Sequence, residues 1–256
     1  MARPRSHLAR APIVEAVIDF RVLAREGIAA DQMSGLLPKI GQQYEPPSMM
    51  HRVEARFGIE RGKALVPTQV EAPLGWVYQC RSQAAVAQFR VDGFTFSKLE
   101  PYTTWEEVFG EARRLWKIYV QVAQPLEVSR LAVRYINRLR LPAPADLGQY
   151  LSAPPVLPEP IPQTVREFLT RVVVDAPERG ISAILIQALE RPLDPSTVQV
   201  LLDIDAFRES VFPAEEPSLL QIFEQLRKLK NEIFFASLTE RTVEMYDDTS
   251  FGFGTT

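Results

Sequence analysis

The chain has 256 residues, of which 46% are hydrophobic and 24% charged, and its formal net charge is −3 at pH 7. This length and composition are typical of a globular protein with a sizeable core and one or two domains. The weak negative charge gives no general attraction to nucleic acid or membranes. The single cysteine, Cys80, excludes an internal disulfide, and the two histidines, His7 and His51, have no zinc-binding spacing.

Targeting and cofactor motifs are missing from the sequence. No apolar run approaches the roughly 18 residues that a membrane-spanning helix needs. The N-terminus lacks the apolar core of a signal peptide, so we expect a cytoplasmic protein without membrane contact. Gly-x-Gly occurs only at Gly252–Gly254, outside the strand–loop–helix context of a phosphate-binding loop. We therefore expect no cofactor, and the lack of a supported catalytic triad favours a protein that is not an enzyme.

The first half of the chain predicts a strand, a modest helix, three more strands and a long helix. The first strand covers Pro12–Val22, where apolar and polar residues alternate. The modest helix covers Ala29–Gln43 and ends before Pro46 and Pro47. The later strands are expected at Met49–Glu60, Gly75–Ser82 and Ala85–Thr95, and the long helix at Thr104–Val122.

The second half repeats this order. A strand at Val128–Leu141 is followed by the proline-rich stretch Pro142–Pro162, which contains a short helical piece at Ala145–Leu151. Strands are then expected at Thr170–Ala176, Ile181–Glu190 and Val198–Ala206, and a helix at Ser218–Leu238. Ile181–Leu189 is apolar on both faces, as expected of a central or interface strand.

The stretches Ala85–Val120 and Val198–Phe235 align with each other as strand, turn and amphipathic helix. Both helices begin with a capping box, Thr104 with Glu107 and Ser218 with Gln221. The predicted fold is therefore α+β with an internal duplication of a β-α-β-β-β-α unit, residues 1–127 forming the first half and residues 128–256 the second. We expect antiparallel sheets that join or abut across an approximate two-fold axis, with the two long helices packed on one face.

The sheet face opposite the helices carries the candidate ligand-binding residues. Arginines there could bind the phosphates or carboxylates of a ligand through two parallel hydrogen bonds. The alternative is that they pair with carboxylates of neighbouring strands, which is the ordinary state of a solvated sheet face. Asn137 falls in an apolar register, where its amide serves either an internal hydrogen bond or a ligand at the seam between the halves. The candidates are Arg52, Arg56, Arg90, Arg134, Asn137 and Arg138.

Asp203 and Asp205 are the weak candidates for a metal site. Their spacing puts both carboxylates on one face of a strand, which is compatible with a divalent cation. Asp92 alone marks the equivalent place in the first half, which argues against such a site. A hydrolase that uses these carboxylates and a metal is thus the least favoured function.

Three segments carry a family resemblance: Ala11–Val17 (APIVEAV), Phe94–Leu99 (FTFSKL) with Pro101, Tyr102 and Trp105, and Arg134–Arg138 (RYINR) with Leu141 and Pro142. They resemble segments of a sporadically distributed family of uncharacterised bacterial and archaeal proteins, and the likeness runs from about Leu8 to the last helix. The family has no established activity, so the resemblance implies no catalytic residue. Its patchy distribution resembles that of defence and toxin–antitoxin modules, which suggests an antitoxin-like accessory role.

The sequence has neither a nucleophile motif nor a metal motif. These observations favour a non-enzymatic binding or assembly protein. Its partner would be another protein or a further copy of itself. The alternative is a protein that binds nucleic acid or a phosphate-bearing ligand through the arginine face, with an affinity that falls steeply as salt rises.

Overall fold

The structure is a computed structural model that describes residues 8–56, 59–60, 63–64, 68–143, 146–190, 196–214 and 218–248, with the main chain only in the described parts of 53–70 and at Ser218. The described strands are β1 (Ile13–Leu23), β2 (Ser48–Arg56), β3 (Ile59–Glu60), β4 (Lys63–Ala64), β5 (Thr68–Cys80), β6 (Ala85–Arg90), β7 (Gly93–Leu99), β8 (Glu127–Pro142), β9 (Leu169–Ala176), β10 (Ile181–Glu190) and β11 (Thr197–Phe212). The described α-helices are α1 (Leu37–Ile40), α2 (Trp105–Ala123), α3 (Ser218–Ser237) and α4 (Glu240–Asp247).

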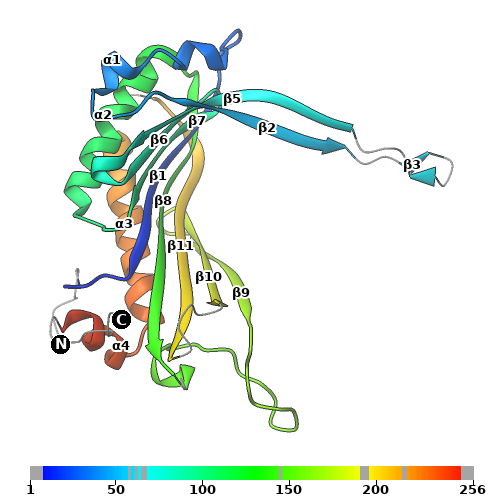
Figure 1. Ribbon diagram of the computed structural model, residues 1–256, viewed down its shortest axis with the longest axis vertical. Helices are drawn as coiled ribbons and strands as arrows, with labels where there is room; N and C mark the ends of the chain where they lie inside the picture. Colours follow the sequence, from blue (N-terminus) through cyan, green and yellow to red (C-terminus); the bar gives the residue numbers. More distant parts are fainter. Residues whose placement is uncertain are drawn as a thin grey trace.

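Nine of these strands form one antiparallel sheet in the order β2-β5-β6-β7-β1-β8-β11-β10-β9. β1 and β8 lie side by side in the middle of the sheet (Figure 1). At one end the β2–β5 hairpin extends away from the body, with the small β3–β4 pair beyond it (Figure 1). At the other end β9 is the terminal strand.

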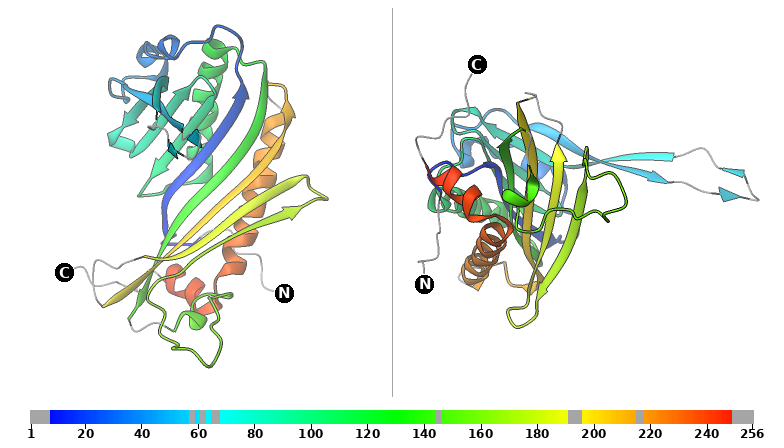
Figure 2. Two further views of the ribbon diagram at one scale, coloured as in Figure 1. Left: turned by 90° about the vertical axis from the view of Figure 1, so that its right-hand side faces the viewer. Right: turned by 90° about the horizontal axis from the view of Figure 1, so that it is seen from below.

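Helices α2 and α3 cover one face of this sheet, and Figure 2 shows α3 running along its length. The alternation predicted for the first strand is confirmed, because Ala16, Ile18 and Phe20 are all buried beneath the helices. The Phe20 ring stacks on Trp116 of α2 with a centroid distance of 4.1 Å. Such aromatic burial contributes strongly to a core of this kind.

Helix α2 begins where the sequence predicted. The Thr104 hydroxyl accepts a hydrogen bond from the backbone N–H of Glu107 at 3.2 Å, which satisfies one of the unpaired donors of the first turn. The buried stripe of α2 includes Leu115, Trp116 and Tyr119, at the spacing of one helical face.

The predicted internal duplication is wrong, and the described residues hold four α-helices rather than two long ones. The described residues form a single continuous nine-stranded sheet with four α-helices, and they show no internal repeat. The aligned stretches differ in structure, since Val91 and Asp92 form a turn while Ile204 and Asp205 lie inside the 16-residue strand β11. The boundary predicted between residues 127 and 128 falls at the start of β8, which is paired with β1.

The strand predicted at Ala85–Thr95 is a hairpin of β6 and β7. Its turn depends on Gly93, whose φ is +155° and whose missing Cβ would lie 2.2 Å from the carbonyl oxygen of Phe20. Only glycine tolerates that approach. The apolar alternation runs through Ala87, Phe89 and Val91 and shifts by one position to Phe94 and Phe96 after Asp92-Gly93. Because Asp-Gly is typical of two-residue hairpin turns, the sequence held a signal for this turn that the single-strand prediction overlooked.

None of the helices in the described ranges is long and apolar enough to cross a membrane.

Candidate functional site

In the interior of the sheet, arginines of the face opposite the helices lie in ion pairs with carboxylates. Arg134 of β8 donates two hydrogen bonds to Asp203 of β11, at 2.9 and 2.6 Å. Arg130 pairs with Asp205 at 2.7 Å, one step along the same two strands. Cross-strand pairing of this kind is how an antiparallel sheet accommodates charge on its solvated face.

A second group of ion pairs surrounds Arg90 of β6, whose side chain is only 5% exposed. Its guanidinium donates to Asp19 at 3.2 Å, to Asp92 at 3.1 Å and to the Thr95 hydroxyl at 2.6 Å. Arg52 reaches the other oxygen of Asp92 at 2.6 Å. Buried guanidinium groups need such partners because an unpaired buried charge is costly.

The remaining candidates of that face are placed as follows. Arg138 pairs with Glu190 of β10 at 2.8 Å. Arg56 ends β2, but its side chain lies outside the described residues. Four of the five arginines proposed from the sequence, Arg52, Arg90, Arg134 and Arg138, thus already have carboxylate partners. The face is balanced in charge at these positions, which does not favour a phosphate site there.

Asp203 and Asp205 both serve arginines. Burial raises the pKa of Asp205, an effect that the nearby Arg130 opposes. Within the described ranges no group of three His, Cys, Asp or Glu side chains is arranged to hold a metal ion. The two aspartates therefore act as ion-pair partners in this fold.

The free edge of the sheet is a second candidate surface. β9 is hydrogen-bonded to β10 along one side and has no other strand partner among the described elements. Its exposed apolar side chains are Leu169, Val172, Val173 and Val174. An exposed apolar edge strand is a ready template for pairing with another chain.

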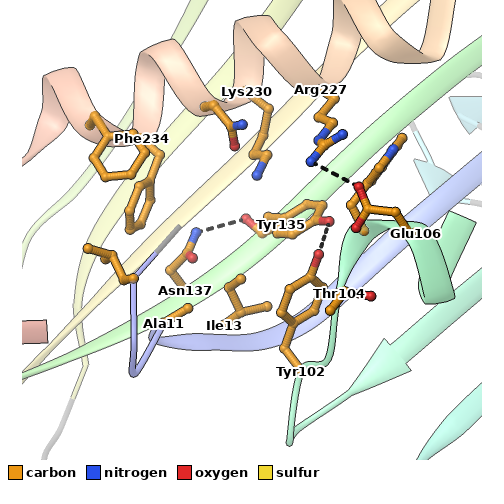
Figure 3. Close-up of a pocket in the computed structure, with 14 residues that line it drawn as sticks. Ala11, Ile13, Tyr102, Thr104, Glu106, Tyr135, Asn137, Arg227, Lys230 and Phe234 are labelled. Atoms are coloured by element: carbon orange, nitrogen blue, oxygen red, sulfur yellow. Dashed lines mark hydrogen bonds and ion pairs between the residues drawn. The ribbon is translucent and has the colours of Figure 1, made fainter. Parts of the chain in front are cut away.

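A pocket of about 260 Å³ opens at the seam between β8, α3 and the segments that precede β1 and α2 (Figure 3). Its apolar lining comes mainly from Ile13, Trp105, Phe234 and Phe235. Asn137 also lines it, although the seam between two duplicated halves at which the sequence placed this residue does not exist in this fold. The Asn137 amide donates to the carbonyl oxygen of Leu202 at 2.9 Å, so the internal hydrogen bond and the pocket position are combined in one side chain.

No protein-family model matches this chain, and no curated protein is significantly similar to it. We therefore infer function from the geometry alone.

Lys230 of α3 is the unusual residue of the pocket. It is 8% exposed, and its Nζ lies 3.7 Å from the centroid of the Tyr135 ring (Figure 3). Burial, and to a lesser degree the neighbouring Arg227, lowers the pKa of this amine to about 7. Lysine is rarely buried without a partner, and perturbed amines of this kind cluster at functional sites.

Sequence reasoning missed Lys230, although a signal was present. The residue lies four positions after Leu226 and four before Phe234, both buried, so it belongs to the apolar stripe of α3. A charged residue in that stripe indicates either a snorkelling side chain or a functional group. The apolar periodicity of the stripe is strong enough that one lysine does not interrupt it.

Proposed function

We propose that this chain is a non-enzymatic assembly protein that binds a second copy of itself through the free edge of β9. The observation that carries the proposal is the self-complementary charge pattern of this strand, Arg171 and Asp175 being placed symmetrically about Val173.

The character of β9 supports an interface. Its residues Leu169, Val172, Val173 and Val174 are 71%, 49%, 49% and 38% exposed. Edge strands that remain unpaired are usually protected by charged side chains, by proline, by a bulge or by a covering segment. The two charges of β9, Arg171 and Asp175, are of opposite sign, so they can pair across a dimer instead of repelling it. β9 contains no proline, and its pairing with β10 is regular throughout.

The pattern selects one register. In an antiparallel pair with Val173 opposite its symmetry mate, Arg171 faces the Asp175 of the other copy, and Val172 faces Val174. Arg171, Val173 and Asp175 share one face of the strand, beside Ile184 of β10. Opposite-charge and β-branched cross-strand pairs each contribute about 0.2–1 kcal/mol, and the two-fold axis doubles every pair except the central one.

Arg171 forms no hydrogen bond or ion pair with another described residue, whereas the arginines of the sheet interior do. Asp175 accepts one hydrogen bond from the Ser182 hydroxyl at 2.6 Å. An incoming Arg171 would therefore meet a carboxylate that has remaining acceptor capacity.

The first test is the molecular mass of the purified chain as a function of concentration, measured by sedimentation equilibrium. We expect dimers at about 50 µM, since association at a specific edge follows mass action. Val173→Lys puts two ammonium groups opposite each other and should give monomers. Val211→Lys, at an exposed valine of β11, is the matched control and should leave the dimer intact. A wild-type chain that stays monomeric at this concentration contradicts the proposal.

A charge exchange tests the register. Arg171→Glu and Asp175→Arg should each give monomers, because like charges then face each other. An equimolar mixture of the two variants should give heterodimers, since the introduced glutamate then faces the introduced arginine, and the unchanged Asp175 of one copy faces the unchanged Arg171 of the other. The double variant should dimerise as the wild type does. Single variants that dimerise normally would show that a different surface is used.

A further inference from the structure

The seam pocket holds a cation that lacks a counterion. Lys230 forms no hydrogen bond or ion pair with another described residue, and its ammonium instead lies against the face of the Tyr135 ring. Its amine points into the pocket between Asn137 and Arg227 (Figure 3). A buried ammonium without a partner is costly, and an anion in the pocket would relieve that cost.

Arg227, the second cation of the pocket, already has carboxylate partners. Arg227 lies 3.6 Å from a carboxylate oxygen of Glu106 on α2 and 3.6 Å from one of Glu224 on its own helix. Its guanidinium also lies over the Trp105 ring, at 5.1 Å from the centroid. Lys230 is therefore the cation available to a ligand, and it matches a ligand with a single negative charge.

The rest of the lining indicates a ligand with an apolar body. Trp105, Phe234, Phe235 and Ile13 supply aromatic and aliphatic surface on several sides. An apolar cavity of about 150 Å³ accommodates benzene, so a pocket of this size has room for a six-membered ring with a carboxylate. Asn137 and the hydroxyl pair of Tyr102 and Tyr135, 2.9 Å apart, add hydrogen-bonding groups near the amine.

We propose that the seam pocket binds a small monocarboxylate with an aromatic or aliphatic body, and that the Lys230 ammonium pairs with its carboxylate. Pockets of this composition, apolar with a few convergent polar groups, are typical of small-molecule sites. The site lies on the helix-covered side of the sheet and is independent of the β9 edge.

Binding at this site depends on pH in a defined direction. The carboxylate ligand is an anion throughout pH 6–9, while Lys230 loses its proton above a pKa of about 7. The other charged or titratable groups of the pocket are Arg227 on α3, Glu106 on α2, Tyr102 before α2 and Tyr135 on β8. Burial raises the pKa of both tyrosines, so they stay protonated in this range. Affinity should thus be greatest near pH 6 and about 100-fold lower at pH 9.

The experiment uses the full chain and three probes: benzoate, hexanoate and the neutral analogue benzamide. Isothermal titration calorimetry at pH 6 should detect at least one of the carboxylates, bound at least tenfold more tightly than benzamide. The carboxylate that binds should lose affinity as pH rises from 7 to 9. Proton uptake should accompany binding above pH 7, visible as a dependence of the measured heat on the ionisation enthalpy of the buffer.

Two lysine variants of α3 complete the test. Lys230→Met replaces the lysine by an uncharged, unbranched side chain one heavy atom shorter, and should reduce carboxylate affinity at least tenfold, with no remaining pH dependence. Lys228→Met is the matched control, since Lys228 is exposed on the same helix, and it should bind as the wild type does. Equal binding of benzoate and benzamide, equal binding by Lys230→Met, or no binding of either carboxylate by the wild type at about 10 mM probe would each overturn the proposal.

Discussion

The ammonium of Lys230 on α3 lies 3.7 Å from the centre of the Tyr135 ring on β8, in the layer between the helix and the sheet. The ring face attracts the cation but does not replace the water that the amine gives up on folding. The low pKa of this amine, about 7, follows from that loss.

Replacing Lys230 by methionine should stabilise the fold, most strongly at low pH. The unfolded lysine has a pKa of about 10.4, so between pH 7 and 10 the unfolded chain holds a proton that the folded chain lacks. The stability of the wild type should therefore rise with pH by up to about 1.4 kcal/mol per unit above pH 7 from this group. Urea denaturation at pH 6, 7, 8 and 9 measures the effect.

In the same series, the free energy of unfolding of Lys230→Met should exceed that of the wild type by the largest amount at pH 6, and this difference should shrink by pH 9. Lys228 is exposed on the same helix, so the difference in unfolding free energy between Lys228→Met and the wild type should not change with pH. A gap that stays constant from pH 6 to 9 would show that the amine titrates in the folded state as it does in the unfolded state.

Gly93→Ala should destabilise the hairpin of β6 and β7. The added Cβ would lie 2.2 Å from the Phe20 carbonyl oxygen, at a φ of +155° that side chains rarely adopt. We expect a loss of about 2 kcal/mol or more in the free energy of unfolding. Gly110→Ala, in α2, meets no atom within 4 Å and should instead stabilise by about 0.5–1 kcal/mol. Thermal denaturation of the two variants compares them directly, and an equal effect of both would contradict the assignment of strain to Gly93.

Asp203→Asn should weaken the sheet through its effect on Arg134. The Asp203 side chain is 5% exposed and accepts both hydrogen bonds of the guanidinium, so the change removes a mostly buried partner. We expect a loss of about 2 kcal/mol, reduced from the fully buried value because Arg134 is partly exposed. Glu190→Gln breaks the more exposed pair with Arg138 and should cost less than about 1 kcal/mol. Chemical denaturation at low and high salt measures the loss of unfolding free energy in both variants. A larger loss for Glu190→Gln than for Asp203→Asn would show that exposure does not govern the strength of these pairs.

The sequence could predict local properties that depend on neighbouring residues. Alternation indicated that Ala16, Ile18 and Phe20 lie on one face of a strand, and all three are buried. The cap at Thr104 indicated where α2 begins. Periodicity and capping are encoded within a few residues, which makes them visible without a partner segment.

What only the tertiary structure decided was which segments meet. The single sheet in place of a duplicated pair and the ion pairs of Arg90 and Arg134 depend on contacts between residues far apart in the sequence. Lys230 is the clearest case. Its place in the apolar stripe of α3 can be seen in the sequence, but its lack of a counterion can be seen only in the structure. The physical reason is that burial and pairing are properties of the space between elements, and that space exists only once β8, α2 and α3 have packed together.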